Sequence, residues 1–192
     1  MGNVGVDCAR ILLSPIDQLA KTDITQSALE RLSRSRIRHV TLVARRGPLQ
    51  ASFTIKELRE LVKLNSVRPV WNTDDFSRID QSMIDKLERP RKRLTELMLK
   101  IIRDNSPSND AQRLWHLQFW RRPKSIHGTT HVESVEFERT ESVDDQSFED
   151  GNLHVRGTGR TEFIPCGLLI KSIGYIGVQV SDKLEQRNFI IS

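Results

Sequence analysis

Two consecutive arginines, Arg45 and Arg46, stand directly after the β-branched run Ile37–Ala44. A nearly continuous apolar run predicts a strand buried on both faces, and α/β sheets place the group that reads an adenosine ribose just after such a strand. An acidic residue there would accept a hydrogen bond from a free 2'-hydroxyl, whereas two guanidinium groups suit a 2'-phosphate. The pattern therefore favours NADP over NAD. Solvated turn residues are the alternative that spacing alone leaves open.

A second candidate binding segment, Gly2-Asn3-Val4-Gly5, opens a helix. Glycines let a backbone approach a pyrophosphate, and the amino end of a helix supplies N–H donors and positive potential. The segment is only half of a phosphate loop, because the strand and the first glycine that normally precede it are missing. An ordinary helix start explains it equally well. The interval from Gly2 to Arg45 exceeds the usual ~20 residues, so we expect an inserted helix between Pro15 and Arg36.

A basic cluster, Arg89-Pro90-Arg91-Lys92-Arg93, lies at the start of a predicted helix, where cations oppose the helix macrodipole. Some other interaction must favour these charges. An acidic protein surface, attracted by electrostatic steering, is one candidate. A solvated basic surface is the other. The formal net charge of +5 agrees with an anionic partner but does not identify it.

Several other classes of site are disfavoured. The histidines have no HExxH or cysteine-paired spacing, so no metal site is predicted, and without a Gly-x-Ser-x-Gly or Walker motif we assign no catalytic residue. Cys8 and Cys166 are expected to be small core residues in a reducing compartment. Aromatic and basic residues alternate over Arg113–Arg122, but the apolar residues between them favour a packed strand over a nucleic-acid site. No apolar run approaches the ~20 residues of a membrane span.

Apolar spacing and capping residues predict helices at four places. These are residues about 2 to 14, a segment capped by Asp23 and Gln26, a segment capped by Thr54 and Glu57, and the stripe Leu94–Ile102. Short strands are expected at Leu114–Trp120, His131–Arg139 and Leu153–Arg156, forming a small antiparallel insert at about 111–160.

The apolar run Cys166–Ile173 fits a returning core strand. The order of helix, strand, helix, insert and strand predicts an α/β fold. We expect a Rossmann-like NADP-binding domain over residues 1–175 that lacks its first strand, followed by a divergent tail at 176–192.

Several long strings of this sequence resemble the adrenodoxin reductases. They are Gly2–Leu12, Thr22–Thr25, Arg45–Gln50, Phe53–Glu60, Arg89–Leu97, Cys166–Leu168 and Ser172–Tyr175. The resemblance covers residues 2–175 and implies a fold of the FAD/NAD(P)-binding type. The site that it implies has a pyrophosphate loop of Gly2, Asn3 and Val4, a 2'-phosphate held by Arg45 and Arg46, and a nucleotide contact from Glu57.

The same resemblance implies a reductase that passes electrons from NADPH through FAD to an acidic [2Fe-2S] ferredoxin (adrenodoxin). The basic surface for this partner maps onto Arg89 and Arg93, with Arg91 and Lys92 as contributors. The family also implies a mitochondrial location, in the matrix or on the matrix side of the inner membrane. Peripheral association with that membrane is therefore expected, without a transmembrane segment.

The sequence departs from the family in three respects. The amino-terminal flavin-binding Gly-x-Gly-x-x-Gly segment and the later Gly-Trp-x-Lys-Arg-Gly-Pro segment do not occur, Gly5 replaces a small alanine, and residues 176–192 follow the family poorly. We therefore expect a truncated NADP-binding part that does not bind FAD alone and is inactive by itself. A non-catalytic NADP-binding or protein-interaction module is the alternative.

Overall fold

The computed structural model describes residues 1–104, 112–143 and 153–174 of the chain. Its α-helices are α1 (Asn3–Leu13), α2 (Ile16–Leu19), α3 (Gln26–Ser33), α4 (Ile55–Val62), α5 (Gln81–Lys86) and α6 (Arg89–Asp104). Its strands are β1 (His39–Val43), β2 (Val67–Trp71), β3 (Arg113–Gln118), β4 (Arg121–His127), β5 (Ser134–Ser142) and β6 (Val155–Pro165). Short 3-10 turns occur at η1 (Pro48–Gln50) and η2 (Thr73–Phe76).

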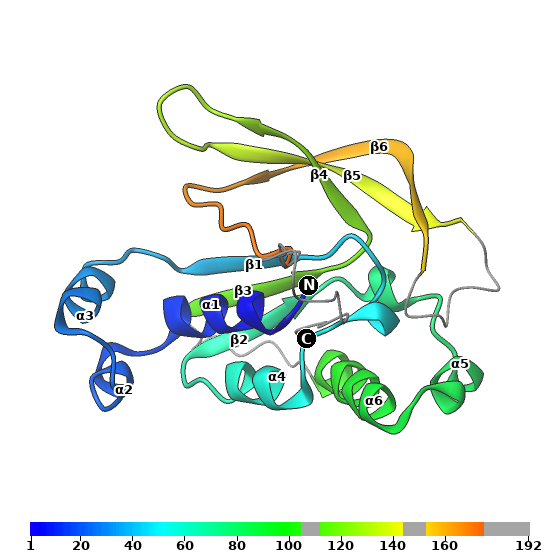
Figure 1. Cartoon of the computed structure of the whole chain (residues 1–192), viewed down its shortest axis with the longest axis horizontal. Helices are drawn as coiled ribbons and strands as arrows, with labels where there is room; N and C mark the ends of the chain where they lie inside the picture. Colours follow the sequence, from blue (N-terminus) through cyan, green and yellow to red (C-terminus); the bar gives the residue numbers. More distant parts are fainter. Residues whose placement is uncertain (105–111, 144–152, 175–192) are drawn as a thin grey trace, which may run out of the picture.

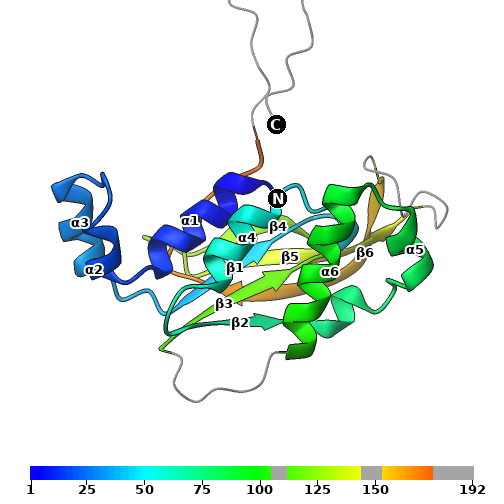
Figure 2. The ribbon, with the colours of Figure 1, turned by 90° about the horizontal axis from the view of Figure 1, so that it is seen from below.

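The strands form two separate sheets. β1, β3 and β2 pair in parallel in that order, because helices connect them and return each strand in the same direction. β4, β5 and β6 form an antiparallel sheet. Figures 1 and 2 show α1, α4 and α6 on one side of the parallel sheet and the antiparallel sheet on the other. The fold is therefore α/β, as predicted.

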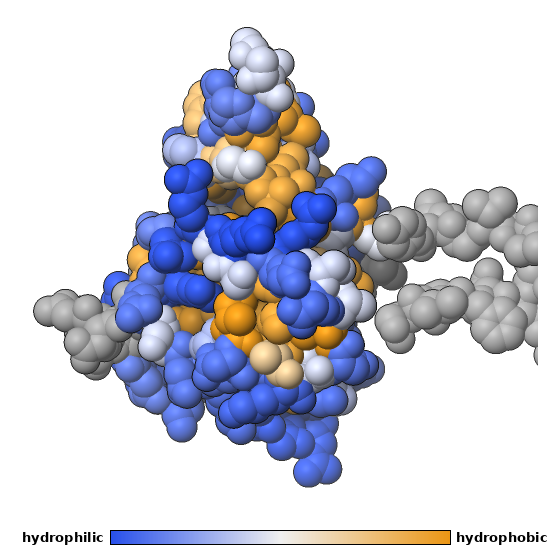
Figure 3. All heavy atoms as spheres, turned by 90° about the vertical axis from the view of Figure 1, so that its left-hand side faces the viewer, coloured by the Kyte–Doolittle hydropathy of each residue, from blue (hydrophilic) through white to orange (hydrophobic). Residues whose placement is uncertain are grey.

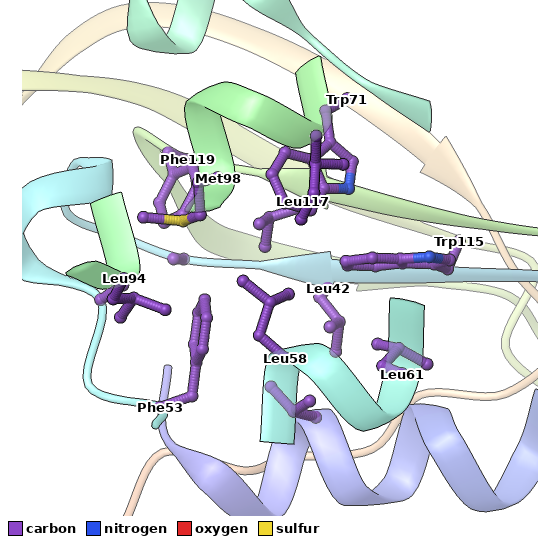
Figure 4. Packing of buried hydrophobic residues seen from close by; sticks show 14 of the residues in the cluster. Leu42, Phe53, Leu58, Leu61, Trp71, Leu94, Met98, Trp115, Leu117 and Phe119 are labelled. Carbon is purple, nitrogen blue, oxygen red and sulfur yellow. The ribbon is translucent and has the colours of Figure 1, made fainter. Parts of the chain in front are cut away.

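The main core lies between the parallel sheet and its helices. Figure 4 shows side chains from α4, α6 and the strands pointing toward one another across this layer. Leu58, Met98, Trp115 and Leu117 are each at most 1% exposed. Burying such side chains contributes about 1.5 to 3 kcal/mol each, so this layer holds the ends of the strands and helices in place.

The predicted helices are present. α1 ends at Leu13, just before Pro15, and α6 buries Leu94, Met98 and Ile101 of the predicted stripe. The N-cap of α4 is Thr54, whose Oγ1 accepts a hydrogen bond from the Glu57 N–H at 3.4 Å. These helices therefore begin or pack where their apolar spacing and capping residues predicted.

The predicted cap of α3 is wrong. The N-cap of this helix is Thr25, whose Oγ1 accepts from the Ala28 N–H, and not Asp23. Asp23 and Thr25 are both residue types that can cap a helix, so the local sequence alone did not decide between them. The inserted helical segment between Pro15 and Arg36 consists of α2 and α3.

The strand predicted at Leu114–Trp120 is also corrected. It is β3, the middle strand of the parallel sheet, and not part of the antiparallel insert. The antiparallel sheet begins only at Arg121, after a corner at Trp120. No strand was predicted at β2, which contains Pro69. The structure tolerates the missing N–H of this proline because β2 is an edge strand.

The returning core strand predicted at Cys166–Ile173 is wrong as well. Residues 166–174 form no strand, and the side chains of Leu168 and Ile173 are 55% and 79% exposed. Apolar character alone predicted burial, but this segment pairs with neither sheet. The predicted tail, residues 176–192, lies outside the described residues.

The surface differs between the two sheets. Figure 3 shows hydrophilic side chains over much of the lower body, while apolar atoms gather over the antiparallel sheet above it. Ile126 on β4 and Phe163 on β6 are 64% and 58% exposed. None of the helices in the described part of the chain has the length and apolar character needed to cross a bilayer.

Candidate nucleotide-binding site

The amino end of α1 presents uncapped backbone donors. Gly2 precedes the helix in an extended conformation, and no side chain caps this end. The first turn therefore has N–H groups without intrahelical partners, at the positive end of the helix macrodipole. A Cβ added to Gly2 would meet no atom within 4 Å, so the space beside this residue is open. An anionic group can approach the backbone here.

Asn3 links this helix end to a second one. Its Oδ1 accepts a hydrogen bond of 2.7 Å from the Thr54 N–H, and Thr54 in turn caps α4 at Glu57. The amino ends of α1 and α4 are therefore neighbours, and Glu57 lies half-buried in the first turn of α4. Because a phosphate accepts hydrogen bonds, the contact of Asn3 with it would come from an N–H group. Val4 is 65% exposed and can offer its backbone N–H.

Arg45 and Arg46 follow β1 by two and three residues, and Arg45 is exposed while Arg46 is half-buried. Burial, and then the positive charges of Arg46 and Arg45, lower the pKa of the Met1 amino group. Both guanidinium charges therefore act on the amino group that precedes α1. β1, which leads into the arginine pair, packs against α1.

The predicted partner-binding cations occupy the first turn of α6. Arg89 and Arg93 are exposed and share one face, whereas Arg91 is half-buried. Lys92 is bound within the chain, since its Nζ lies 2.6 Å from Asp85 Oδ1. This hydrogen bond raises the pKa of Lys92 and lowers the pKa of Asp85. Lys92 therefore has less freedom to bind a partner than the two exposed arginines.

The exposed face of α6 carries further cations that the sequence reasoning missed. Lys100 and Arg103 are exposed and follow Arg89 and Arg93 along the same side of the helix, as does one acidic residue, Glu96. The sequence signal that could have revealed these cations is their helical spacing from the cluster at positions 89 to 93. The basic surface thus runs along the helix and is not confined to its first turn.

The structure has a cavity in a different place. A volume of about 560 Å³ over β5 and β6 is lined by Arg139, Thr140, Glu141, Gly157, Thr158 and Arg160. None of the predicted nucleotide-binding residues lines it. A dinucleotide lies extended at the carboxyl edge of a parallel sheet, so the open edge beside α1 is the better candidate. Among the described residues no group of His, Cys, Asp and Glu is arranged to hold a metal ion.

Comparison with known proteins shows what the chain is similar to. Over 174 residues, 48% are identical to the mitochondrial NADPH:adrenodoxin oxidoreductase of Drosophila melanogaster, a match that covers 91% of this chain and 34% of that protein. The chain is homologous to part of an adrenodoxin reductase. The human adrenodoxin reductase is 42% identical over 180 residues, covering 91% of this chain and 36% of its own length. The chain thus spans about a third of the length of the curated adrenodoxin reductases that it matches.

A solved structure supports the same relationship. Mycobacterium tuberculosis FprA in complex with NADPH superposes with a TM-score of 0.83 at 36% sequence identity, covering 93% of this chain and 38% of that one. The predicted α/β, Rossmann-like fold of the FAD/NAD(P)-binding type is thereby confirmed. No protein-family model matches the chain.

Proposed function

We propose that this chain provides the NADP-binding part of an adrenodoxin-type, NADPH-dependent flavoprotein reductase. The observation that carries the proposal is the placement of the arginines: Arg45 and Arg46 lie just after β1, and β1 packs against α1, whose amino end at Gly2 is uncapped. The relatives are named as NADPH-dependent oxidoreductases, and FprA was solved with NADPH, which supports the same assignment.

The residues fit the phosphates of NADP. Backbone N–H groups of Asn3 and Val4 would hold the pyrophosphate at the uncapped end of α1, where Gly2 leaves open space. Arg45 and Arg46 would hold the 2'-phosphate through charge-assisted hydrogen bonds. The half-buried Glu57 would contact the nucleotide from the neighbouring helix end. The chain's own role is then to bind and orient the nucleotide.

The complete activity would require more than this chain. When bound, NADPH would supply a hydride to FAD, which would pass the two electrons one at a time to a [2Fe-2S] ferredoxin and release the proton. The acidic ferredoxin would dock on the basic face of α6 that carries Arg89 and Arg93. The relatives' names support a mitochondrial location, and we propose the matrix, or peripheral attachment on the matrix side of the inner membrane.

Nucleotide titration tests the proposal. We expect the chain to bind NADPH more tightly than NADH in isothermal titration calorimetry. Arg45→Ala should weaken NADPH binding by about 1.5 to 3 kcal/mol, the contribution of hydrogen bonds to charged groups, and leave NADH binding unchanged. Arg31→Ala, an exposed arginine on α3, is the matched control and should behave as wild type. Equal affinities for the two nucleotides in wild type would refute the proposal.

A second measurement concerns catalysis. We propose that the 192 residues bind no FAD by themselves and do not reduce ferredoxin. Flavin absorbance after incubation with FAD and gel filtration, followed by an assay of ferredoxin reduction by NADPH, tests this statement. Bound flavin together with electron transfer would contradict it. NADPH binding without electron transfer is the result expected for a truncated reductase and also for a non-catalytic module. The nucleotide titration and the ferredoxin assay are therefore interpreted together.

A further inference from the structure

The backbone of the arginine pair is held by residues far away in the sequence. Three consecutive carbonyl oxygens accept hydrogen bonds from the region where the two sheets meet. The Ala44 oxygen accepts from the Arg121 N–H at 3.0 Å, and the Arg46 oxygen accepts from the Trp120 N–H at 3.3 Å. Between them, the Arg45 oxygen accepts from the Thr140 hydroxyl at 2.7 Å. The last of these bonds comes from a side chain.

Thr140 is placed to make this contact by an irregularity of β5. The pairing of β5 with β6 shifts register between Glu138 and Thr140, and Thr140 is buried. Its N–H donates to the Trp120 carbonyl at 2.8 Å, while its hydroxyl reaches the Arg45 carbonyl. Thr140 therefore joins the antiparallel sheet both to the corner after β3 and to the segment that carries the arginines.

Buried hydrogen bonds and close packing hold the corner itself. Asp75 is buried, and its Oδ2 accepts from the Phe119 N–H at 2.8 Å and from Arg121 Nη1 at 2.6 Å. Trp120 has a left-handed backbone with φ of 60°, which a large side chain adopts only when its surroundings hold it. A Cβ on Gly47 would lie 2.1 Å from Trp120 Cζ2, so the indole packs directly against this glycine. The arginine segment thus lies against a fixed support.

We propose that Thr140 is a positioning residue for NADP selectivity, because its hydroxyl fixes the backbone of Arg45 and so directs the guanidinium toward the 2'-phosphate. The inference rests on the proposed function. Without the hydroxyl, the Arg45 carbonyl loses its partner while the flanking Ala44 and Arg46 carbonyls stay bound. The Arg45 side chain, which distinguishes NADPH from NADH in the proposed function, is then held less firmly in one direction. The hydrogen bonds of Thr140 go to Trp120 and Arg45. The groups at the start of α1 that bind the rest of the nucleotide should therefore be unaffected.

The test measures NADPH and NADH affinities of the full 192-residue chain by calorimetry. Thr140→Val keeps the shape and removes the hydroxyl, and Thr140→Ser keeps the hydroxyl. The matched control is Thr158→Val, because the Thr158 hydroxyl also donates to an arginine carbonyl, that of Arg139, at 3.1 Å on the same sheet. Circular dichroism and urea unfolding of each variant report on the fold.

We expect Thr140→Val to weaken NADPH binding by about five- to tenfold and to leave NADH binding unchanged. Thr140→Ser should restore the preference, and Thr158→Val should match wild type. Equal weakening of both nucleotides, or an unchanged preference in a folded Thr140→Val chain, would overturn the inference and leave the proposed function standing. A wild-type chain that binds neither nucleotide would overturn both.

Discussion

The carboxamide of Asn3 accepts a hydrogen bond of 2.7 Å from the backbone N–H of Thr54, a residue 51 positions later in the chain. This contact joins the first residue of α1 to the N-cap residue of α4. Because the amino ends of both helices carry unpaired N–H groups, the bond brings two regions of positive potential side by side. An anion between them would experience both.

Removing this bond should separate its structural and binding roles. Asn3→Ala deletes the acceptor and should lower the free energy of unfolding by about 0.5 to 1.5 kcal/mol, a typical net value for one hydrogen bond. Asn3→Asp keeps an acceptor and adds a charge that favours the helix end, so its stability should match wild type. The same charge repels phosphate, so Asn3→Asp should bind NADPH more weakly.

Urea denaturation and NADPH titration of both variants check these outcomes. Gln26→Ala is a suitable control, since its amide donates at 3.1 Å to Glu30 on the exposed surface of α3. Exposed pairs of this kind contribute only about 0.2 to 0.5 kcal/mol. An unfolding free energy of Asn3→Ala equal to that of wild type would show that the contact does not tie the helices together.

A histidine on the parallel sheet should make stability depend on pH. The rings of His116 and His39 stack with centroids 6.0 Å apart, and burial, followed by the charges of His39 and Arg68, lowers the pKa of His116 below 6.5. Between this lowered pKa and 6.5 the unfolded chain binds more protons than the folded one, so stability rises with pH. Acidification below about pH 6.5 should therefore destabilise the fold.

His116→Gln removes this titration. Its unfolding free energy should fall less than that of wild type when urea denaturation at about pH 7.5 is compared with about pH 5.5. His131→Gln, in an exposed loop, is the control and should follow wild type. If His116→Gln loses as much stability as wild type over this interval, other groups cause the acid sensitivity.

The elements nearest the candidate site were the most predictable. β1 and α4 have local signals, a β-branched run and a cap at Thr54, that the structure retains. α6 has a regular apolar stripe that packs as expected. Local spacing decides such elements because their cause lies within a few residues of chain.

The mistakes concern contacts that no local pattern encodes. Parallel pairing of β3 with β1 joins His39 to Leu114, over seventy positions apart, so the sequence around Trp115 did not reveal which sheet it entered. The run Cys166–Ile173 has the composition of a core strand but pairs with neither sheet. The hydroxyl of Thr140 was equally invisible, because a single threonine at a register shift has no signature until the fold is known.

Under the proposed function, the basic face of α6 should control association with an acidic ferredoxin. Arg93→Glu reverses an exposed charge and should slow association several-fold at about 0.01 M ionic strength, with a smaller effect at about 0.15 M, where screening is stronger. Arg31→Glu makes the same change of charge on α3, at the far end of the molecule in Figure 1, and is the control. Stopped-flow or surface plasmon resonance gives the rates. If both variants slow association equally, net charge alone attracts the partner and the face of α6 is not its docking surface.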